Sequence, residues 1–157
     1  MTAMAVVLAE HAPAGVDVGR VMRMIVMHDV VEIDAGDTFA FDAVGHVDKA
    51  ARERAAADRI FGLLPTDLAG ECRALWDEFE HGETSDARMA NALDRFAALL
   101  QNSAHGDGGT WREHRISRAA VMRRMDPIRE GLPALWPYVL SVIDAADAAN
   151  VFGTDGS

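Results

Sequence analysis

The sequence predicts an all-α protein that forms one domain, a helical bundle of about six or seven helices. Three observations support this fold class. Ala, Leu, Met, Glu and Arg dominate the chain, and these residues favour helices. No stretch shows the alternating, β-branched pattern that is typical of strands. The length of 157 residues is enough for one domain with a sizeable core and is short for two.

The first two helices and the loop after them are defined by local signals. A short apolar helix is expected over residues 2–11, where the sequence APAG ends it. Asp17 is expected to cap a second helix that runs through Val31. The buried face of that helix is predicted from apolar residues at helical spacing: Val18, Val21, Met22, Ile25 and Val26. Gly36 and the sequence DTFAFDAVGH predict a longer loop, of the kind that often forms a site.

Five further helices are expected after this loop. They cover, in order, residues 47–64, 65–81, 85–104, 110–127 and 131–152. Pro65 begins the second of these helices and Gly82 ends it. We expect residues 1–152 to form the domain and residues 153–157 to form a flexible tail.

The composition argues against several classes of function. No apolar run reaches the roughly 18 residues that a membrane-spanning helix needs, and the N-terminus lacks the basic segment of a signal peptide. The single cysteine, Cys72, cannot form an internal disulfide and fits a reducing compartment, so we expect a cytoplasmic protein without membrane contacts. The net charge of −10 argues against binding to a nucleic-acid backbone. An anionic substrate would need a local positive centre, and a metal ion is the simplest source.

The functional argument centres on residues 21–42, VMRMIVMHDVVEIDAGDTFAFD. Its apolar residues predict a buried segment, yet it carries acids and a histidine that packing does not require. His28, Asp29 and Glu32 share one helix face, because residues three and four apart lie together, and they can converge on one point. An adjacent histidine and aspartate offer a nitrogen and an oxygen ligand for a divalent ion. Asp37 follows on the turn that contains Gly36.

Asp94 is a further candidate ligand. Apolar neighbours place it at or near a buried helix face: Leu93, Phe96, Ala97 and Leu100. A buried acid must be paired, hydrogen-bonded or bound to an ion. Spacing alone leaves two alternatives open, which are a metal ligand or a salt bridge to an arginine such as Arg95 or Arg88.

Three segments together resemble the HD-domain hydrolases, in the branch that includes the 5′-deoxynucleotidases: MHDVVEIDAGDTFAFD, ARMANALDRFAALLQN and GGTWREHRISRAAVMRRMDPI. The resemblance covers essentially the whole chain and implies an all-helical HD domain with one divalent metal. By the match, His28, Asp29 and Asp94 are metal ligands. The resemblance also implies that Glu32 handles the water or a phosphate-linked proton, and that Asp37 orients this chemistry or the substrate sugar.

The chain departs from the family pattern at its N-terminus. The family's first metal histidine lies in a segment similar to EHSWH, which would fall about one helical turn before Met1. His11 lies too far along the first helix to replace it. Two alternatives follow. In the first, the start codon is misassigned or the chain is clipped, and the complete protein carries this segment. In the second, the chain is natural and has a weakened metal site. We favour the first.

The resemblance implies a metal-dependent phosphohydrolase that releases phosphate from small phosphomonoesters, with (deoxy)nucleoside 5′-monophosphates as the expected substrates. The mixed nitrogen and oxygen ligands favour Mn²⁺, Co²⁺, Fe²⁺ or Mg²⁺, one ion per subunit, over structural zinc. The way the family pairs through its helices implies a homodimer. The alternative is a nucleotide-binding or interaction protein that keeps the scaffold without turnover, and the missing histidine favours it.

Other conspicuous residues are expected to have structural roles. Trp76, Trp111 and Trp136 occupy apolar helical positions, which predicts the core or a dimer interface. The basic residues of segment 110–127 could attract a phosphate, but a solvated face is the favoured interpretation. They are Arg112, Arg115, Arg118, Arg123 and Arg124.

Overall fold

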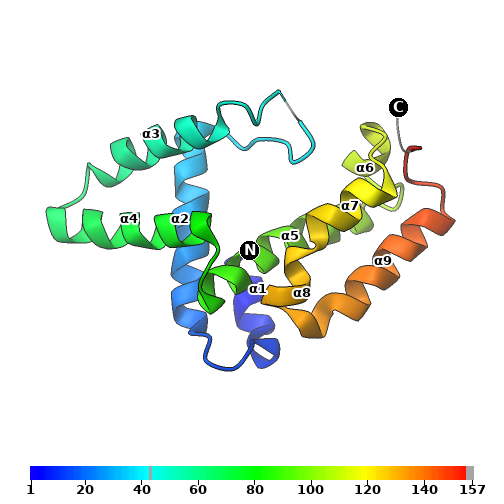
Figure 1. Ribbon diagram of the computed structural model, residues 1–157, viewed down its shortest axis with the longest axis horizontal. Helices are drawn as coiled ribbons and strands as arrows, with labels where there is room; N and C mark the ends of the chain where they lie inside the picture. Colours follow the sequence, from blue (N-terminus) through cyan, green and yellow to red (C-terminus); the bar gives the residue numbers. More distant parts are fainter. Residues whose placement is uncertain (43, 155–157) are drawn as a thin grey trace.

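The computed structural model describes residues 1–42 and 44–154, and these residues form a helical protein without β-strands (Figure 1). The predicted all-α fold class is confirmed. The helices are α1 (Thr2–Val7), α2 (Val18–Ala35), α3 (Lys49–Phe61), α4 (Thr66–His81), α5 (Ser85–Ala104), α6 (Thr110–Glu113), α7 (Arg118–Met125), α8 (Pro127–Gly131) and α9 (Trp136–Ala148), with 3₁₀ turns η1 (Ala9–His11) and η2 (Pro133–Leu135).

Three predicted helices are divided into shorter pieces, and one of them is the last, residues 131–152, which contains the end of α8, the 3₁₀ turn η2 and α9. The first consists of α1 followed by η1. The segment 110–127, predicted as one basic helix, contains α6, a turn and α7 instead. The turn forms because Arg115 adopts a left-handed conformation with φ of 51°, and Ser117 then caps α7 by accepting a hydrogen bond from the Ala120 amide at 3.3 Å. Neither glycine nor proline marks this break in the sequence.

The caps of α2 follow the sequence signals. Asp17 accepts a hydrogen bond from the Arg20 amide at 3.1 Å, as predicted for an N-cap. Gly36 ends the helix with a φ of 76°, a conformation that glycine adopts readily. The helix therefore extends beyond Val31 and includes Glu32. On its predicted buried face, Val26 is 39% exposed, because the face that packs inward passes through Met24 and His28.

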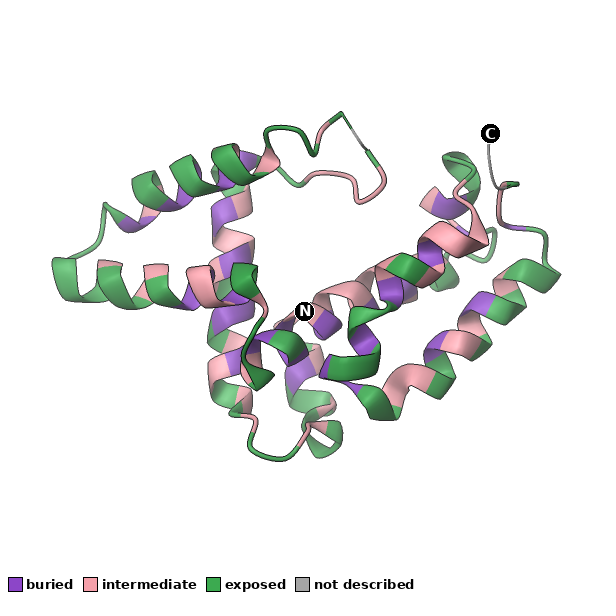
Figure 2. Cartoon of the chain, in the orientation of Figure 1, coloured by how far each residue is buried: buried purple, intermediate pink, exposed green. Residues whose placement is uncertain are grey.

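The helix α2 lies at the centre of the arrangement. Figure 1 shows α3 and α4 on one side of α2, and α5, α7, α8 and α9 on the other. Buried residues form two clusters along these contacts (Figure 2). Val21, Met24 and Ile25 of α2 belong to the larger cluster, whereas Val31 and Ala35 belong to the smaller one, which packs against α3 and α4. The two clusters of buried residues, which both include residues of α2, thus fix the position of this helix.

Specific contacts hold α2 and α5 to their neighbours. Arg20 of α2 forms an ion pair with Glu78 of α4, and its Nε lies 3.8 Å from Asp86 of α5. The hydrogen bond from Arg20 lowers the pKa of Glu78. The helix α8 packs so closely on α5 that a Cβ atom at Gly131 would overlap the backbone oxygen of Arg88.

The remaining sequence expectations concern the tryptophans, the tail and the membrane. Trp76 and Trp111 are buried in the core, and Trp136 packs against it partly buried. Residues 155–157 of the predicted tail lie outside the described residues, while the Gly153 amide donates a hydrogen bond to the Ile116 carbonyl at 3.0 Å. In the described part of the chain, no helix has the length and apolar character to cross a membrane.

Candidate metal centre

His28, Asp29 and Glu32 converge near the C-terminal end of α2. One donor atom from each side chain lies within 4.8 Å of the other two. The helical spacing that predicted this convergence brings them together, because residues three and four apart share one face. His28 is only 7% exposed, while Asp29 and Glu32 are half-buried. One imidazole nitrogen and two carboxylates form a donor set that suits Mn²⁺, Fe²⁺, Co²⁺ or Mg²⁺.

The imidazole of His28 lies between two carboxylates. Its Nε2 is 3.5 Å from Oε1 of Glu32, and its Nδ1 is 3.5 Å from Oε1 of Glu80. The ring stacks on Phe79, with centroids 4.1 Å apart. Burial lowers the pKa of His28, but the hydrogen bond with Glu80 and the charges of Glu32 and Asp94 outweigh burial, so the pKa is raised.

Glu80 is a site residue that sequence reasoning missed. It lies on α4 within the charged run WDEFEHG, where nothing distinguishes it from a solvated acid and no spacing relates it to His28. Burial raises the pKa of Glu80, yet the hydrogen bond and charge of His28 outweigh burial and lower it. A carboxylate on Nδ1 fixes the ring while Nε2 faces the other donors, which is the usual arrangement around a metal-binding histidine.

The electrostatics of the cluster favour a cation. Burial raises the pKa of both Asp29 and Glu32, and the charges of Asp37 and Asp94 raise it further, although His28 opposes them. A raised pKa means that the ionised form of each carboxyl group is less favourable in the folded protein than in water. A divalent ion would offset that cost, and the nitrogen and oxygen donors fit such an ion.

Asp37 and Asp94 line the same cavity as Glu32. Asp37 lies on the loop that follows α2, and Asp94 lies on α5. The carboxylate of Asp94 forms an ion pair with Arg95, which is one of the two alternatives that spacing left open. Asp94 does not belong to the group whose donor atoms lie within 4.8 Å of one another, which consists of His28, Asp29 and Glu32. Its negative charge nevertheless raises the pKa of each of these three residues.

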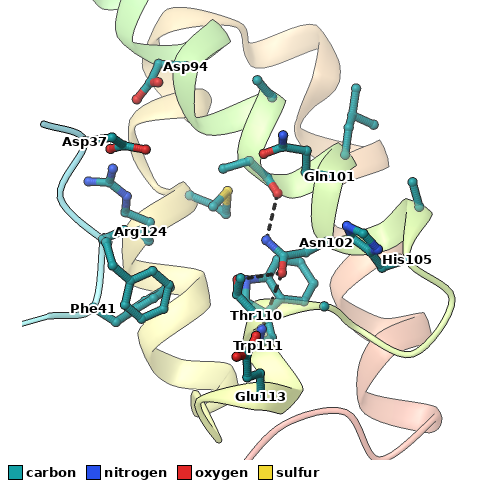
Figure 3. Close-up of a pocket in the computed structure, with 18 of the residues that line it drawn as sticks. Asp37, Phe41, Asp94, Gln101, Asn102, His105, Thr110, Trp111, Glu113 and Arg124 are labelled. Atoms are coloured by element: carbon teal, nitrogen blue, oxygen red, sulfur yellow. Dashed lines mark hydrogen bonds between the residues drawn. The ribbon is translucent and has the colours of Figure 1, made fainter. Parts of the chain in front are cut away.

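The cavity has a volume of about 1190 Å³, and Figure 3 shows side chains that line it. The loop after α2, the helix α5, the α5–α6 connection and α7 form its walls. Phe39 and Phe41 contribute aromatic surface, and Thr110 donates a hydrogen bond to Oδ1 of Asn102 at 2.8 Å. The volume is large enough for a small organic ligand.

Arg124 corrects the interpretation of the basic segment. Arg112, Arg115 and Arg123 are exposed, as expected for a solvated face, although Arg112 also lies at the edge of the cavity. Arg124 lines the cavity and is partly buried. Burial, together with the charge of Arg95, lowers the pKa of Arg124 to about 10.

Comparisons with known proteins identify relatives of this chain. A family model described as HD domain matches residues 1–136. The chain is 34% identical to the 5′-deoxynucleotidase HDDC2 of Homo sapiens over 88 residues, which are 56% of this chain and 43% of that protein. It is also 34% identical to HDDC2 of Xenopus laevis over 82 residues, 52% of this chain and 41% of that protein. The alignment therefore spans less than half the length of these curated relatives.

A solved structure resembles the whole chain. It is the crystal structure of a protein described as a predicted metal-dependent phosphohydrolase from Magnetospirillum magnetotacticum MS-1. The two structures agree with a TM-score of 0.88 and 47% sequence identity, over 98% of this chain and 78% of the other.

Proposed function

The chain belongs to the HD-domain family, and we propose that it is a metal-dependent phosphohydrolase that releases phosphate from (deoxy)nucleoside 5′-monophosphates. The convergence of His28, Asp29 and Glu32 carries this proposal, because it combines metal-ligand chemistry with a carboxylate that lines a large cavity. The descriptions of the relatives as 5′-deoxynucleotidases and as a metal-dependent phosphohydrolase support both the reaction class and the substrate class.

His28, Asp29 and Asp94 would hold the ion, which we expect to be Mn²⁺, Co²⁺, Fe²⁺ or Mg²⁺. A bound ion would supply Lewis acidity toward the phosphoryl group and toward water. Glu80 would keep the His28 ring oriented through Nδ1. Asp94 lies on the cavity wall, where its carboxylate forms an ion pair with Arg95.

Glu32 would act as the acid–base group. Burial and the neighbouring acids raise the pKa of Glu32 toward neutral pH. A carboxyl group with a raised pKa is better suited to accept and return a proton. It would accept a proton from the attacking water while the water oxygen bonds to phosphorus. The bond from phosphorus to the ester oxygen then breaks, and that oxygen takes the proton back from Glu32 and leaves as the nucleoside hydroxyl. Asp37, on the same cavity wall, would orient the water or the substrate sugar.

The cavity would hold the nucleoside. Phe39 and Phe41 lie on the loop that covers it and offer aromatic surface to a base. Asn102 is held in place by its hydrogen bond with Thr110, and Gln101 lies beside it on α5. These amides could bond to sugar or base atoms. A ligand in this space would also exclude water from the reacting phosphate.

A phosphate-release screen tests the proposal. The chain, freed of metal with a chelator, would be supplied with each of the four ions and with 5′-monophosphates, 3′-monophosphates and triphosphates of nucleosides and deoxynucleosides. Phosphate release from the 5′-monophosphates that depends on the ion is the expected result. Nucleotide binding without release under every ion would instead support a nucleotide-binding protein without turnover, the alternative considered from the sequence.

The proposal includes three further expectations from the sequence: a homodimer, a cytoplasmic location and a domain that spans residues 1–152. Sedimentation velocity tests the first, and a single-chain mass at every concentration would contradict it. Cell fractionation tests the second. Limited proteolysis tests the third, because cleavage is then expected only after residue 152.

A further inference from the structure

Arg124 is an exception among the arginines of the described chain. Most others form an ion pair with an acid, such as Arg20 with Glu78 or Arg95 with Asp94. In the described part of the chain, three other arginines make neither an ion pair nor a side-chain hydrogen bond, and all three lie exposed on the surface: Arg54, Arg115 and Arg123. Arg124 is partly buried, and among the described residues no carboxylate forms an ion pair with it.

The guanidinium of Arg124 carries an unsatisfied hydrogen-bond donor. Its Nε is buried and has no hydrogen-bond partner. Burial and the charge of Arg95 lower the pKa of Arg124 to about 10, although the charges of Asp94 and Asp37 partly oppose this effect. A buried donor without a hydrogen-bond partner is unfavourable for folding, so a partly buried arginine of this kind is typical of a binding site whose ligand supplies the missing acceptor.

The position of Arg124 restricts what that ligand can be. Asp37, Asp94 and Arg124 lie at the same end of the cavity, on the loop after α2, on α5 and on α7 (Figure 3). The two acids would repel an approaching anion. Arg95 does little to offset them, because it is already paired with Asp94. Arg124 is therefore the side chain that can attract and orient an anionic group at this end of the cavity.

We propose that Arg124 binds the phosphate of the substrate and makes the site selective for phosphomonoesters over unphosphorylated nucleosides. The planar guanidinium presents Nε and a terminal nitrogen as a pair of donors, which matches two oxygens of a phosphate. The proposal rests on the function proposed above, because it assigns a residue to the phosphate of that substrate. It also accounts for a buried donor that the folded chain leaves unsatisfied.

Calorimetry with three matched variants tests this role. The probes are inorganic phosphate, 2′-deoxyadenosine 5′-monophosphate and 2′-deoxyadenosine, each titrated with and without Mn²⁺. Arg124→Gln should weaken binding of the two phosphate-containing probes by about tenfold to a hundredfold, and should leave the nucleoside unaffected. Arg124→Lys should keep part of the affinity, since it retains the charge but loses the paired donors. Arg123→Gln, a change at the exposed neighbour, should match the wild type.

Thermal unfolding provides a second readout that separates binding from structure. Arg124→Gln should keep or raise the melting temperature of the ligand-free protein, because it removes a partly buried charge whose Nε has no hydrogen-bond partner. It should also lose the stabilisation that phosphate confers on the wild type. A lower melting temperature with an undiminished response to phosphate would identify Arg124 as a structural residue and overturn the proposal.

The outcomes distinguish this inference from the proposed function. Unchanged phosphate affinity in Arg124→Gln overturns the role of Arg124, even if the chain hydrolyses monophosphates. Phosphate binding that depends on Arg124, in a chain that releases no phosphate under any ion, supports the role of Arg124 and contradicts the proposed function. Absence of phosphate binding by the wild type overturns the inference.

Discussion

Replacement of Glu32 by glutamine tests the proton-transfer role most directly. Glutamine keeps the size and shape of the side chain, so the packing of α2 should be preserved, but it cannot accept a proton from water. Glu32 lines the cavity and lies 3.5 Å from Nε2 of His28, so the substitution acts at the reacting centre. His28, Asp29 and Asp94 remain to bind the ion.

The expected loss follows from the surroundings of Glu32. Removal of a positioned acid–base group costs about 10²–10⁴-fold in kcat, or about 2.7–5.5 kcal/mol. We expect a value near the middle of this range, about a thousandfold, because Glu32 is only half-buried and solvent can carry part of the proton transfer.

Although Glu32→Gln should lower kcat, it should make the folded protein more stable than the wild type at higher pH. Burial and the nearby acids raise the folded-state pKa of Glu32, so the wild type loses stability as the pH rises through that value. Glu32→Gln lacks this titration, and its free energy of unfolding relative to the wild type should increase over the same pH range. Chemical denaturation in the presence of a chelator measures the difference.

The assay is release of phosphate from a deoxynucleoside 5′-monophosphate at saturating Mn²⁺, with Asp34→Asn as the control. Asp34 lies on the same helix, but it is exposed and pairs with Arg59, so its replacement should leave kcat unchanged. A kcat for Glu32→Gln equal to that of the wild type would refute the acid–base assignment.

Three further predictions concern the surrounding structure. Glu80→Gln should weaken Mn²⁺ binding by about tenfold to a hundredfold in calorimetry, because His28 loses the charged carboxylate that orients its ring. Glu78→Gln should lower the free energy of unfolding by about 1 kcal/mol at neutral pH. The hydrogen bond from Arg20 lowers the pKa of Glu78, so this difference should disappear in denaturant titrations as the pH falls through that lowered value. Gly131→Ala should cost about 3 kcal/mol or more in the same measurement, because a Cβ there would overlap the backbone of α5.

Matched variants separate these effects from general damage. Glu83→Gln alters an exposed acid close to Glu80 in the sequence and should leave Mn²⁺ affinity unchanged. Gly70→Ala places a Cβ atom in open space on α4 and should be neutral or stabilising by up to about 1 kcal/mol. Equal Mn²⁺ affinity in Glu80→Gln, or equal stability in Gly131→Ala and Gly70→Ala, would contradict the contacts described for Glu80 and Gly131.

The features predicted correctly depend on interactions close in the sequence. Asp17 caps α2 and Gly36 ends it, because capping involves residues within one helical turn. His28, Asp29 and Glu32 converge for the same reason, since one helix fixes their relative positions whatever packs around it. The all-α class follows from composition and periodicity summed over the whole chain.

The features that the sequence missed depend on contacts between distant residues. Glu80 reaches His28 only because α4 packs against α2. The spacing of residues along the sequence does not predict that contact. The break at Arg115 places a residue other than glycine at positive φ, which local preference disfavours and the surrounding packing maintains.

The sequence by itself therefore determined the all-α class, the caps of α2 and the cluster of donor atoms on that helix. Only the tertiary structure decided which side chains face that cluster. It placed Glu80 against one nitrogen of His28, brought Asp94 onto the wall of the cavity, and turned Arg124 toward that cavity while Arg123 remained in solvent. The physical reason is that helix periodicity fixes geometry within one helix, whereas the packing of helices against one another fixes which of their faces meet.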